Sequence, residues 1–385
     1  MLDPIALHQP SIRGNEWRYV KDCLDSGWVS SAGKYVELFE EAIRVYTGST
    51  FAVSCMNGSA ALQLSLKLAG VTQGDEVIVP TITFIASVNA IHHNSATPVF
   101  IDADNYCNLD VRKTIEFIRT ETTFDGCNSI NRKSGRRVAA IIPVHVFGNA
   151  VWLDELVPLC QERNIPVVED AAESLGTRYS LGNYAGQHTG TVGDIGCLSF
   201  NGNKIITSGG GGMILTNSRE FAERACYLTT QAKDDSKEFR HDEAGFNYRL
   251  TNIQAALGLA QLENLSCFLE EKKTNFQKYT QLFKAVQNVE IGKVPDYAIN
   301  NHWITWVSLQ SRYPKSLASL IESFSRQGIE VRPVWKPNHL QKPYLHSQRF
   351  NIDRAEDLVR STLCLPSSAG LTDFELQRVV DCFDE

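Results

Sequence analysis

Short apolar runs rich in β-branched residues alternate with longer amphipathic stretches through about the first 200 residues. The apolar runs predict strands, which cover Phe51–Ser54, Glu76–Pro80, Thr97–Ile101, Val138–Pro143, Ile165–Glu169 and Gly196–Phe200. The stretches between them predict helices over Ser59–Ala69, Phe84–His93, Asp110–Thr120 and Leu153–Arg163. Strands that alternate with helices indicate βαβ units and therefore an α/β fold with a mostly parallel sheet.

The hydrophobic pattern changes after about residue 250. Apolar residues then recur at steps of three and four from Thr251 to Val286, and this spacing predicts a long helix that connects two domains. The pattern after this helix is strand, helix, strand and two helices. We therefore predict an N-terminal arm over 1–32, a large α/β domain over 33–250, a connecting helix over 251–287 and a small C-terminal α+β domain over 288–385.

The composition is that of an ordinary globular protein, with 43% hydrophobic and 21% charged residues among 385. A formal net charge of −7 provides no bulk basic field, so we expect no nucleic-acid partner and no attraction to anionic lipid. The sequence contains no signal-peptide pattern and no uninterrupted apolar run of about 18 residues, so we expect a cytoplasmic protein without a membrane span. The basic stretch Asn128–Arg137 is more simply a solvated loop than a ligand site.

Cysteine, histidine and glycine patterns exclude several common sites. The ten cysteines fall singly without a CxxC pair, so we expect reduced, mostly buried thiols. The histidines form no recognisable ligand set, and we expect no metal site. Gly190, Gly193 and Gly196 are spaced GxxGxxG rather than GxGxxG, and Lys204 lies in no P-loop motif, so the common nucleotide motifs are absent.

Polar features follow three predicted strands, at the edge where open α/β sheets bind ligands. The first is the turn Asn57-Gly58-Ser59-Ala60, whose helix-opening amides can hold a phosphate or can serve only as a helix cap. The second is the acidic segment that contains Asp170 and Glu173 after a buried strand. A carboxylate there can bind a protonated ring nitrogen, a metal or a ribose, or can cap a helix.

The third feature is Lys204, which lies between the predicted strand ending at Phe200 and four glycines, 209–212. A lysine at such a place can form a Schiff base, although a single lysine is also commonly a solvated surface charge. Considered together, a phosphate-binding turn, a strand-end aspartate and a strand-end lysine are the parts needed to hold pyridoxal phosphate. The aspartate keeps the pyridine nitrogen protonated, and the lysine carries the cofactor.

Seven sequence blocks carry a resemblance to one protein family. They are GWVSSAGKYVELFE (27–40), NGSAALQLSL (57–66), GDEVIVPTITFIAS (74–87), PVHVFG (143–148), VVEDAAESLG (167–176), SFNGNKIITSGGGGMILTN (199–217) and GFNYRLTNIQAALGLAQLE (245–263). Along nearly its whole length the chain resembles the DegT–DnrJ family of pyridoxal-phosphate sugar aminotransferases. The resemblance implies the type I fold of aspartate aminotransferase, with a mixed, mostly parallel sheet of the seven-stranded type and a smaller C-terminal domain.

The resemblance also implies roles for the matching residues. Lys204 forms the Schiff base and moves the proton between substrate and cofactor, Asp170 pairs with the ring nitrogen, and Phe84 stacks on the ring. The phosphate is held by Ser59, the Ala60 amide and Ser199. The implied cofactor-binding set is Gly58, Ser59, Ala60, Phe84, Asp170, Glu173, Ser199, Asn201, Lys204 and Asn247.

Two of these positions carry special expectations. Asn247 matches a residue that reaches the phosphate from the partner subunit, so a homodimer with shared active sites is expected. Glu173 stands where many members have Gln or His facing the phenolic oxygen of the cofactor. Because a carboxylate repels a phenolate, Glu173 is either protonated or turned elsewhere.

The implied reaction converts a nucleotide-linked 4-keto-6-deoxy sugar to its 4-amino sugar, with L-glutamate as donor. The sequence is most similar to the branch that makes bacillosamine- or legionaminic-type precursors, which suggests a UDP-linked 2-acetamido-4-keto-2,6-dideoxyhexose for lipopolysaccharide, O-antigen or other glycan synthesis. GDP- and dTDP-linked 4-keto sugars stay open. Related dehydratases replace the lysine with histidine, so Lys204 argues against them, and a non-catalytic sensing module is the remaining alternative.

The diphosphate of such a substrate needs cations or backbone amides. The candidates are Lys34 in the arm, Arg249 in the block 245–263, and the stretch Arg332–His339. Within this stretch we expect His339 to bind the substrate. Each of these can instead be an ordinary surface or structural residue.

Overall fold

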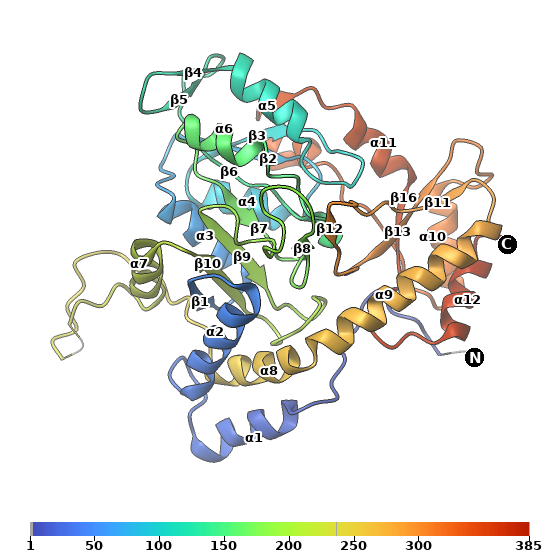
Figure 1. The fold of residues 1–385 in the computed structure, drawn as a ribbon, viewed down its shortest axis with the longest axis horizontal. Helices are drawn as coiled ribbons and strands as arrows, with labels where there is room; N and C mark the ends of the chain where they lie inside the picture. Colours follow the sequence, from blue (N-terminus) through green and yellow to red (C-terminus); the bar gives the residue numbers. More distant parts are fainter. Residues whose placement is uncertain (1–2, 236, 385) are drawn as a thin grey trace.

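Two four-stranded sheets form the centre of the computed structural model, which describes residues 3–235 and 237–384. Their strands are β1 (Phe51–Cys55), β2 (Glu76–Pro80), β3 (Thr97–Ile101), β6 (Val138–Ile141), β7 (Val168–Asp170), β9 (Ile195–Ser199), β10 (Gly212–Thr216) and β15 (Arg349–Phe350). The strand orders are β1-β10-β9-β7 and β15-β3-β2-β6 (Figure 1). Parallel bridges between Ile141 and Val167 and between Val144 and Asp170 join the two sheets into one β-layer.

The directions of the strands match the predicted class. β2 pairs in parallel with β3 and β6, and β7 pairs in parallel with β9. β10 runs antiparallel to both β1 and β9. The prediction of an α/β fold with a mixed, mostly parallel sheet is therefore confirmed, although β10 itself was not among the predicted strands.

Helices precede, separate or follow the strands of the β-layer along the chain. They are α2 (Lys34–Thr47), α3 (Gly58–Leu68), α4 (Ile85–His93), α5 (Val111–Thr120), α6 (Leu156–Glu162) and α7 (Arg219–Thr229). The helix α3 packs on β9 and β10, and its Leu62, Leu64 and Leu66 are almost completely buried. The predicted strands and helices of this region are present with shifted ends; the strand predicted over Ile165–Glu169 lies at Val168–Asp170.

The prediction of a single connecting helix over 251–287 is wrong. Two helices, α8 (Asn252–Glu263) and α9 (Leu265–Leu282), meet at Asn264, whose φ of −102° and ψ of 1° interrupt the helical backbone. The helix α8 packs on α2, where a Cβ on Gly258 would lie 2.7 Å from the ring of Phe39. The first helix therefore belongs to the large unit, and only α9 reaches the small one (Figure 1).

The small C-terminal unit is an antiparallel sheet with the order β11-β13-β16-β14 and its own hydrophobic core. Its elements are β11 (Val289–Ile291), β13 (Thr305–Leu309), α10 (Leu317–Arg326), β14 (Arg332–Pro333), α11 (Arg354–Ser361), β16 (Thr362–Leu365) and α12 (Asp373–Asp381). Two segments cross the predicted domain boundaries. Ile5 of the arm pairs with Ile329 and is buried in this core, whereas β15 returns to pair with β3. Both chain ends lie beside this unit (Figure 1).

Three further groups of α-helices and strands complete the fold. They are α1 (Glu16–Ser26), the pair β4 (Thr122–Phe124) and β5 (Ser129–Asn131), and the pair β8 (Arg178–Tyr179) and β12 (Ala298–Ile299). Seven of the ten cysteines are buried, and no disulfide occurs within the described ranges. Among those same residues, no helix has the length and apolar character required to cross a bilayer.

Candidate active site

A cavity of about 760 Å³ opens beside the carboxyl ends of β7 and β9. The carboxyl ends of strands in the β-layer and the segments that follow them contribute Asn57, Gly58, Ser59, Phe84, Ser87, Asp170, Glu173, Ser199, Asn201 and Lys204. The arm and the small unit contribute Leu7, His8, Trp303, Glu330, Arg332, Trp335 and Lys336. The structure therefore brings all predicted cofactor-binding residues into one cavity except Ala60 and Asn247.

Asp170 ends β7 and is held in place from both sides. Its side chain is buried, Oδ2 accepts a hydrogen bond from Ser87 Oγ at 2.6 Å, and Oδ1 accepts one from the Ala172 N–H at 3.1 Å. The backbone N–H of Asp170 donates to Pro143 O at 2.9 Å, which ties the strand end to the neighbouring segment. A carboxylate so fixed can meet a protonated ring nitrogen at a defined position.

Lys204 and Glu173 face each other across the cavity floor. Lys204 Nζ lies 3.4 Å from Glu173 Oε1 and 4.2 Å from the centre of the Trp303 ring, while Glu173 Oε2 accepts the Phe147 N–H at 2.9 Å. Burial raises the pKa of the Glu173 carboxyl, and Lys204 and the Phe147 amide offset only part of that rise. The Glu173 side chain therefore points toward Lys204, and burial favours its protonated form.

The backbone of Phe147, which donates its N–H to Glu173, has an unusual conformation. It lies in the short 3₁₀ segment Val146–Gly148 with a φ of 56°, in the left-handed region that non-glycine residues rarely adopt. That conformation presents its N–H to Glu173, while its ring stacks on Trp335 at 5.2 Å. Phe147 thus links the Glu173 carboxylate to the small unit.

A glycine-lined turn connects β1 to α3 at the other end of the cavity. A Cβ on Gly58 would lie 2.9 Å from Ser199 Cβ, so only glycine lets this turn approach β9 closely. The hydroxyls of Ser59 and Ser199 both line the cavity beside the turn. Asn57 Oδ1 accepts the Ala60 N–H at 2.8 Å, so the Asn57 side chain caps α3 and the Ala60 amide is not available for a phosphate in this structure.

These residues fit pyridoxal phosphate. The turn and its two serine hydroxyls form a cradle for an anion at a helix N-terminus. A fixed carboxylate and a lysine amine lie at the neighbouring strand ends, which matches the two groups that the ring nitrogen and the aldehyde of the cofactor require. Phe84, whose side chain is 55% exposed at the cavity edge, offers a ring for stacking.

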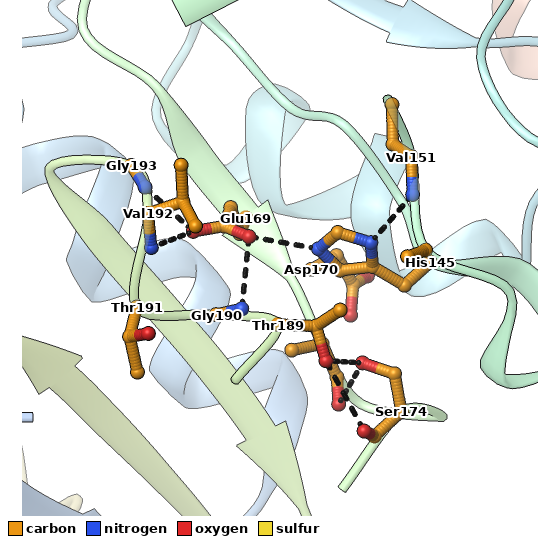
Figure 2. A network of polar contacts seen from close by, with 12 residues as sticks. His145, Val151, Glu169, Asp170, Ser174, Thr189, Gly190, Thr191, Val192 and Gly193 are labelled. Atoms are coloured by element: carbon orange, nitrogen blue, oxygen red, sulfur yellow. Dashed lines mark hydrogen bonds and ion pairs between the residues drawn. The ribbon is translucent and has the colours of Figure 1, made fainter. Parts of the chain in front are cut away.

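A second polar network lies directly behind Asp170, around the fully buried Glu169 (Figure 2). Glu169 Oε1 accepts the N–H groups of Val192 at 2.8 Å and Gly193 at 2.6 Å. Its Oε2 accepts the Gly190 N–H at 2.8 Å and faces His145 Nε2 at 2.9 Å. Burial alone would raise the pKa of this carboxyl, but His145 and the amides together hold it below its ordinary value.

The same network explains the glycine spacing noted in the sequence. A Cβ on Gly196 would lie 1.9 Å from Gly190 O, and one on Gly193 would lie 2.7 Å from Val167 O. These glycines therefore let the loop 190–193 close against β7 and β9. Their function is structural, which agrees with the exclusion of a dinucleotide motif.

Besides Ala60, four predicted site residues do not line the cavity. Lys34 is exposed and pairs with Asp22 at 2.7 Å. Arg249 pairs with Glu40 at 2.6 Å. His339 is buried with Nδ1 2.7 Å from Thr81 Oγ1, and the exposed Asn247 accepts a hydrogen bond from Gln231 at 3.0 Å.

The predicted stretch Arg332–His339 nevertheless reaches the cavity through other members, Arg332, Trp335 and Lys336. Sequence reasoning missed His8 and Trp303 altogether. No local signal marks them, because they come from the arm and the small unit and join the site only through the tertiary fold.

A β-layer with a lysine and a fixed aspartate at its strand ends, both lining one cavity, is the arrangement expected of an aminotransferase of fold type I. The chain belongs to the DegT/DnrJ/EryC1/StrS aminotransferase family, which matches residues 10–384. It is a pyridoxal-phosphate-dependent sugar aminotransferase.

Particular relatives align with nearly the whole chain. The GDP-perosamine synthase of Caulobacter vibrioides is 37% identical and covers 100% of this chain and 98% of its own. The putative pyridoxal phosphate-dependent aminotransferase EpsN of Bacillus subtilis is 35% identical and covers 98% of this chain and 94% of its own. Among solved structures, the aminotransferase TlmJ of Streptoalloteichus hindustanus superimposes with a TM-score of 0.87 at 27% identity, over 99% of this chain and 98% of that one.

Proposed function

We propose that this enzyme transfers the amino group of L-glutamate to C4 of a nucleotide-linked 4-keto-6-deoxy sugar, for surface-glycan synthesis. The joint placement of Lys204, Asp170 and the glycine-lined turn in one cavity carries the proposal. Lys204 argues against the dehydratase alternative, because those relatives have histidine there. The presence of Lys204, Asp170 and the phosphate-binding turn together also favours an enzyme over a non-catalytic sensing module. The cytoplasmic location expected from the sequence is part of this proposal.

Each residue has a distinct task in the reaction. Pyridoxal phosphate, when bound, supplies the electron sink that stabilises negative charge at the substrate carbon. Asp170 keeps the ring nitrogen protonated, and Ser59 and Ser199 bind the phosphate. Lys204 moves the proton at the substrate carbon as acid and base, and the hydrogen bond to Glu173 sets the direction of its amine.

The substrate diphosphate is proposed to bind at the cavity mouth rather than at Lys34, Arg249 or His339. Arg332 and Lys336 are exposed and line the cavity, and Arg332 pairs with Glu330 at 2.6 Å. Trp335 lies between them in sequence and offers an aromatic face. Guanidinium and ammonium groups at an open mouth suit a diphosphate, because they form charge-assisted hydrogen bonds without having to be buried.

Two acceptor sugars are supported by different observations. A GDP-linked 4-keto-6-deoxyhexose is supported by the relative named GDP-perosamine synthase. A UDP-linked 2-acetamido sugar is supported by Glu173, because glutamate at this position also occurs in the branch that acts on acetamido sugars. The basic stretch 128–137 does not favour either sugar, because it does not line the cavity. Its Arg137 instead pairs with Asp75 at 2.6 Å.

The active unit is proposed to be a homodimer with shared sites. Asn247 is exposed and lies outside the cavity of its own chain, as expected of a residue that serves a partner. Beside the cavity, a hollow of about 340 Å³ lined by Ser59, Phe84 and Tyr248 leaves the phosphate turn open to a second copy.

An acceptor screen over UDP-, GDP- and dTDP-linked 4-keto sugars tests the function. The glutamate half-reaction, followed by the absorbance of the cofactor, is measured separately from transfer to the sugar. We expect Arg332→Ala and Lys336→Ala to raise KM for the sugar about tenfold and to leave the glutamate half-reaction unchanged. Lys342→Ala, an exposed cation outside the cavity, is the matched control. Absence of any glutamate half-reaction contradicts the proposed function.

A further inference from the structure

The indole ring of Trp303 lies against the amine of Lys204, and the proposed mechanism gives this tryptophan no task. Trp303 comes from the small unit, just before β13, and it lines the cavity with only 4% of its surface exposed. Lys204 Nζ lies 4.2 Å from the centre of the ring. The face of an aromatic ring attracts a cation within about 6 Å, and it does so more strongly when both groups are removed from water. The Lys204 side chain is 13% exposed, so little water competes with the ring.

Hydrogen bonds fix the position of this ring relative to Lys204. Trp303 Nε1–H donates to the backbone oxygen of Asn203 at 2.7 Å, and Asn203 directly precedes Lys204 in the chain. The backbone N–H of Trp303 donates to Asn301 Oδ1 at 2.9 Å. Asn301 Nδ2 in turn donates to the backbone oxygen of Glu173 at 2.9 Å. The loop that carries Trp303 is therefore tied to the segments of both residues that meet on the cavity floor.

Glu173 alone does not account for the position of the amine. Its Oε1 lies 3.4 Å from Lys204 Nζ, which is longer than an ordinary N–H···O hydrogen bond of about 2.7–3.2 Å. Burial also favours the protonated form of Glu173, and a neutral carboxyl attracts an ammonium less than a carboxylate does. The ring of Trp303 is then the second group that holds the amine.

The proposed reaction requires the amine of Lys204 to alternate between two states. Lys204 Nζ bonds to the aldehyde carbon of pyridoxal phosphate with release of one water, and it leaves as a free amine when the nitrogen of the donor replaces it. The positive charge of a free ammonium is concentrated at one nitrogen, which is the form that an aromatic face attracts most strongly. We propose that the indole face of Trp303 holds the free amine of Lys204, which makes Trp303 the positioning residue for the group that moves the proton.

This proposal rests on the role of Lys204 in the proposed function, but cofactor binding tests it without any sugar. Pyridoxal phosphate bonds to Lys204, whereas pyridoxamine phosphate has no aldehyde and leaves the amine free. The ratio of the two affinities therefore measures the cost of taking the amine away from the ring. In Trp303→Leu we expect the affinity for pyridoxal phosphate, relative to that for pyridoxamine phosphate, to rise about tenfold. A ring that only packs against the cofactor would lower both affinities and leave their ratio unchanged.

Fluorinated tryptophans at position 303, introduced by amber suppression, remove the possibility that a cavity left by leucine causes the effect. Fluorine withdraws electrons from the face of the ring while its shape and Nε1–H are kept, so the ratio should rise stepwise with the number of fluorine atoms. Trp303→Phe, which keeps a ring, should give a smaller rise than Trp303→Leu. The matched control is the same series at Trp306, which is 6% exposed on β13 but does not line the cavity, and there we expect no change.

The glutamate half-reaction provides a second measurement. Because glutamate must release the amine of Lys204, its KM should rise about tenfold in Trp303→Leu. A ratio that stays constant in Trp303→Leu or across the fluorinated series, or an equal rise in the Trp306 series, would overturn the proposal. If the ratio shifts as expected but no 4-keto sugar accepts an amino group, the proposed sugar substrate fails and the role of Trp303 stands.

Discussion

Replacing Glu169 by glutamine removes one charge from the network behind Asp170 and changes almost no volume. Each carboxylate oxygen accepts two donors, so the amide group of glutamine must face two of them whichever way it is turned. His145 cannot relieve the conflict by moving its proton. Its Nδ1 already accepts the Val151 N–H at 3.0 Å, which fixes the proton on Nε2 (Figure 2).

The expected loss follows from these two mismatches. A buried donor left without an acceptor costs about 1–3 kcal/mol, and hydrogen bonds to a charged group are at the upper end of the usual range. Two such donors give a loss of about 4 kcal/mol for Glu169→Gln, a large share of the roughly 5–15 kcal/mol that stabilises a typical domain. Because the loop and strand held by Glu169 also carry Asp170, cofactor affinity should fall with stability.

Urea unfolding followed by circular dichroism and by tryptophan fluorescence measures this loss, provided that the two transitions coincide. Glu162→Gln, at an exposed carboxylate 3.5 Å from Arg163, is the control and should change stability by no more than about 0.5 kcal/mol. A loss below about 1 kcal/mol for Glu169→Gln would show that the network is not an ionised carboxylate with four donors.

The pH dependence of the free energy of unfolding provides a second test of the charge on Glu169. The native pKa of Glu169 lies below its ordinary value, so its contribution is complete above the unfolded pKa and is lost as the pH falls through the native one. The gap between wild type and Glu169→Gln should therefore narrow as the pH drops below about 4.5, the ordinary pKa of glutamate. A gap that is unchanged at low pH would contradict this assignment of charge.

The other predictions concern the cofactor site, the dimer and the contact between the two units. Lys204→Ala should lose turnover at least about a hundredfold, and borohydride treatment of the wild type followed by peptide mapping should label Lys204; a label elsewhere contradicts its role. Asp170→Asn should bind cofactor weakly and act slowly, because a neutral amide does not keep the ring nitrogen protonated; wild-type turnover at saturating cofactor would refute this. Mixing Asn247→Ala with Lys204→Ala protomers should restore activity, since one site per heterodimer is then complete; inactive heterodimers, verified by mixed-tag pull-down, would refute the shared site. Asp102→Asn should cost about 3 kcal/mol in urea unfolding, because this buried carboxylate binds Lys113 Nζ at 2.6 Å and the Ala355 N–H at 2.8 Å; a loss below about 1 kcal/mol would contradict that.

The β-layer could be predicted from sequence because its strands are short, apolar and separated by amphipathic helices. The missed strand β10 lacks these signals at its start, where it follows three further glycines, 209–211, and begins with Gly212 itself. The break at Asn264 was also invisible, since the spacing of apolar residues continues from α8 into α9 while they pack on different units. Periodicity shows which face is buried but not what it is buried against.

The cofactor half of the site was predictable for a related reason. Asp170, Ser199 and Lys204 lie at or just after strand ends, and strand ends of a parallel sheet meet at one edge, so local position alone brings them together. His8, Trp303 and the mouth residues reach the cavity only because the arm pairs with the small unit at Ile329. The charged candidates Lys34 and Arg249 do not line the cavity of their own chain, and a sequence does not show that each already has a carboxylate partner.

The two halves of the cavity are built in physically different ways, and this has a consequence for evolution of specificity. The cofactor side depends on buried, multiply bonded groups such as Glu169, so a change there lowers stability and cofactor affinity together. The mouth depends on exposed cations such as Arg332 and Lys336, where a change costs little stability. With the substrate diphosphate placed at the mouth as proposed, new sugar or nucleotide preferences would arise by substitution there while Asp170 and Lys204 keep their geometry, as expected for one reaction used on several nucleotide sugars.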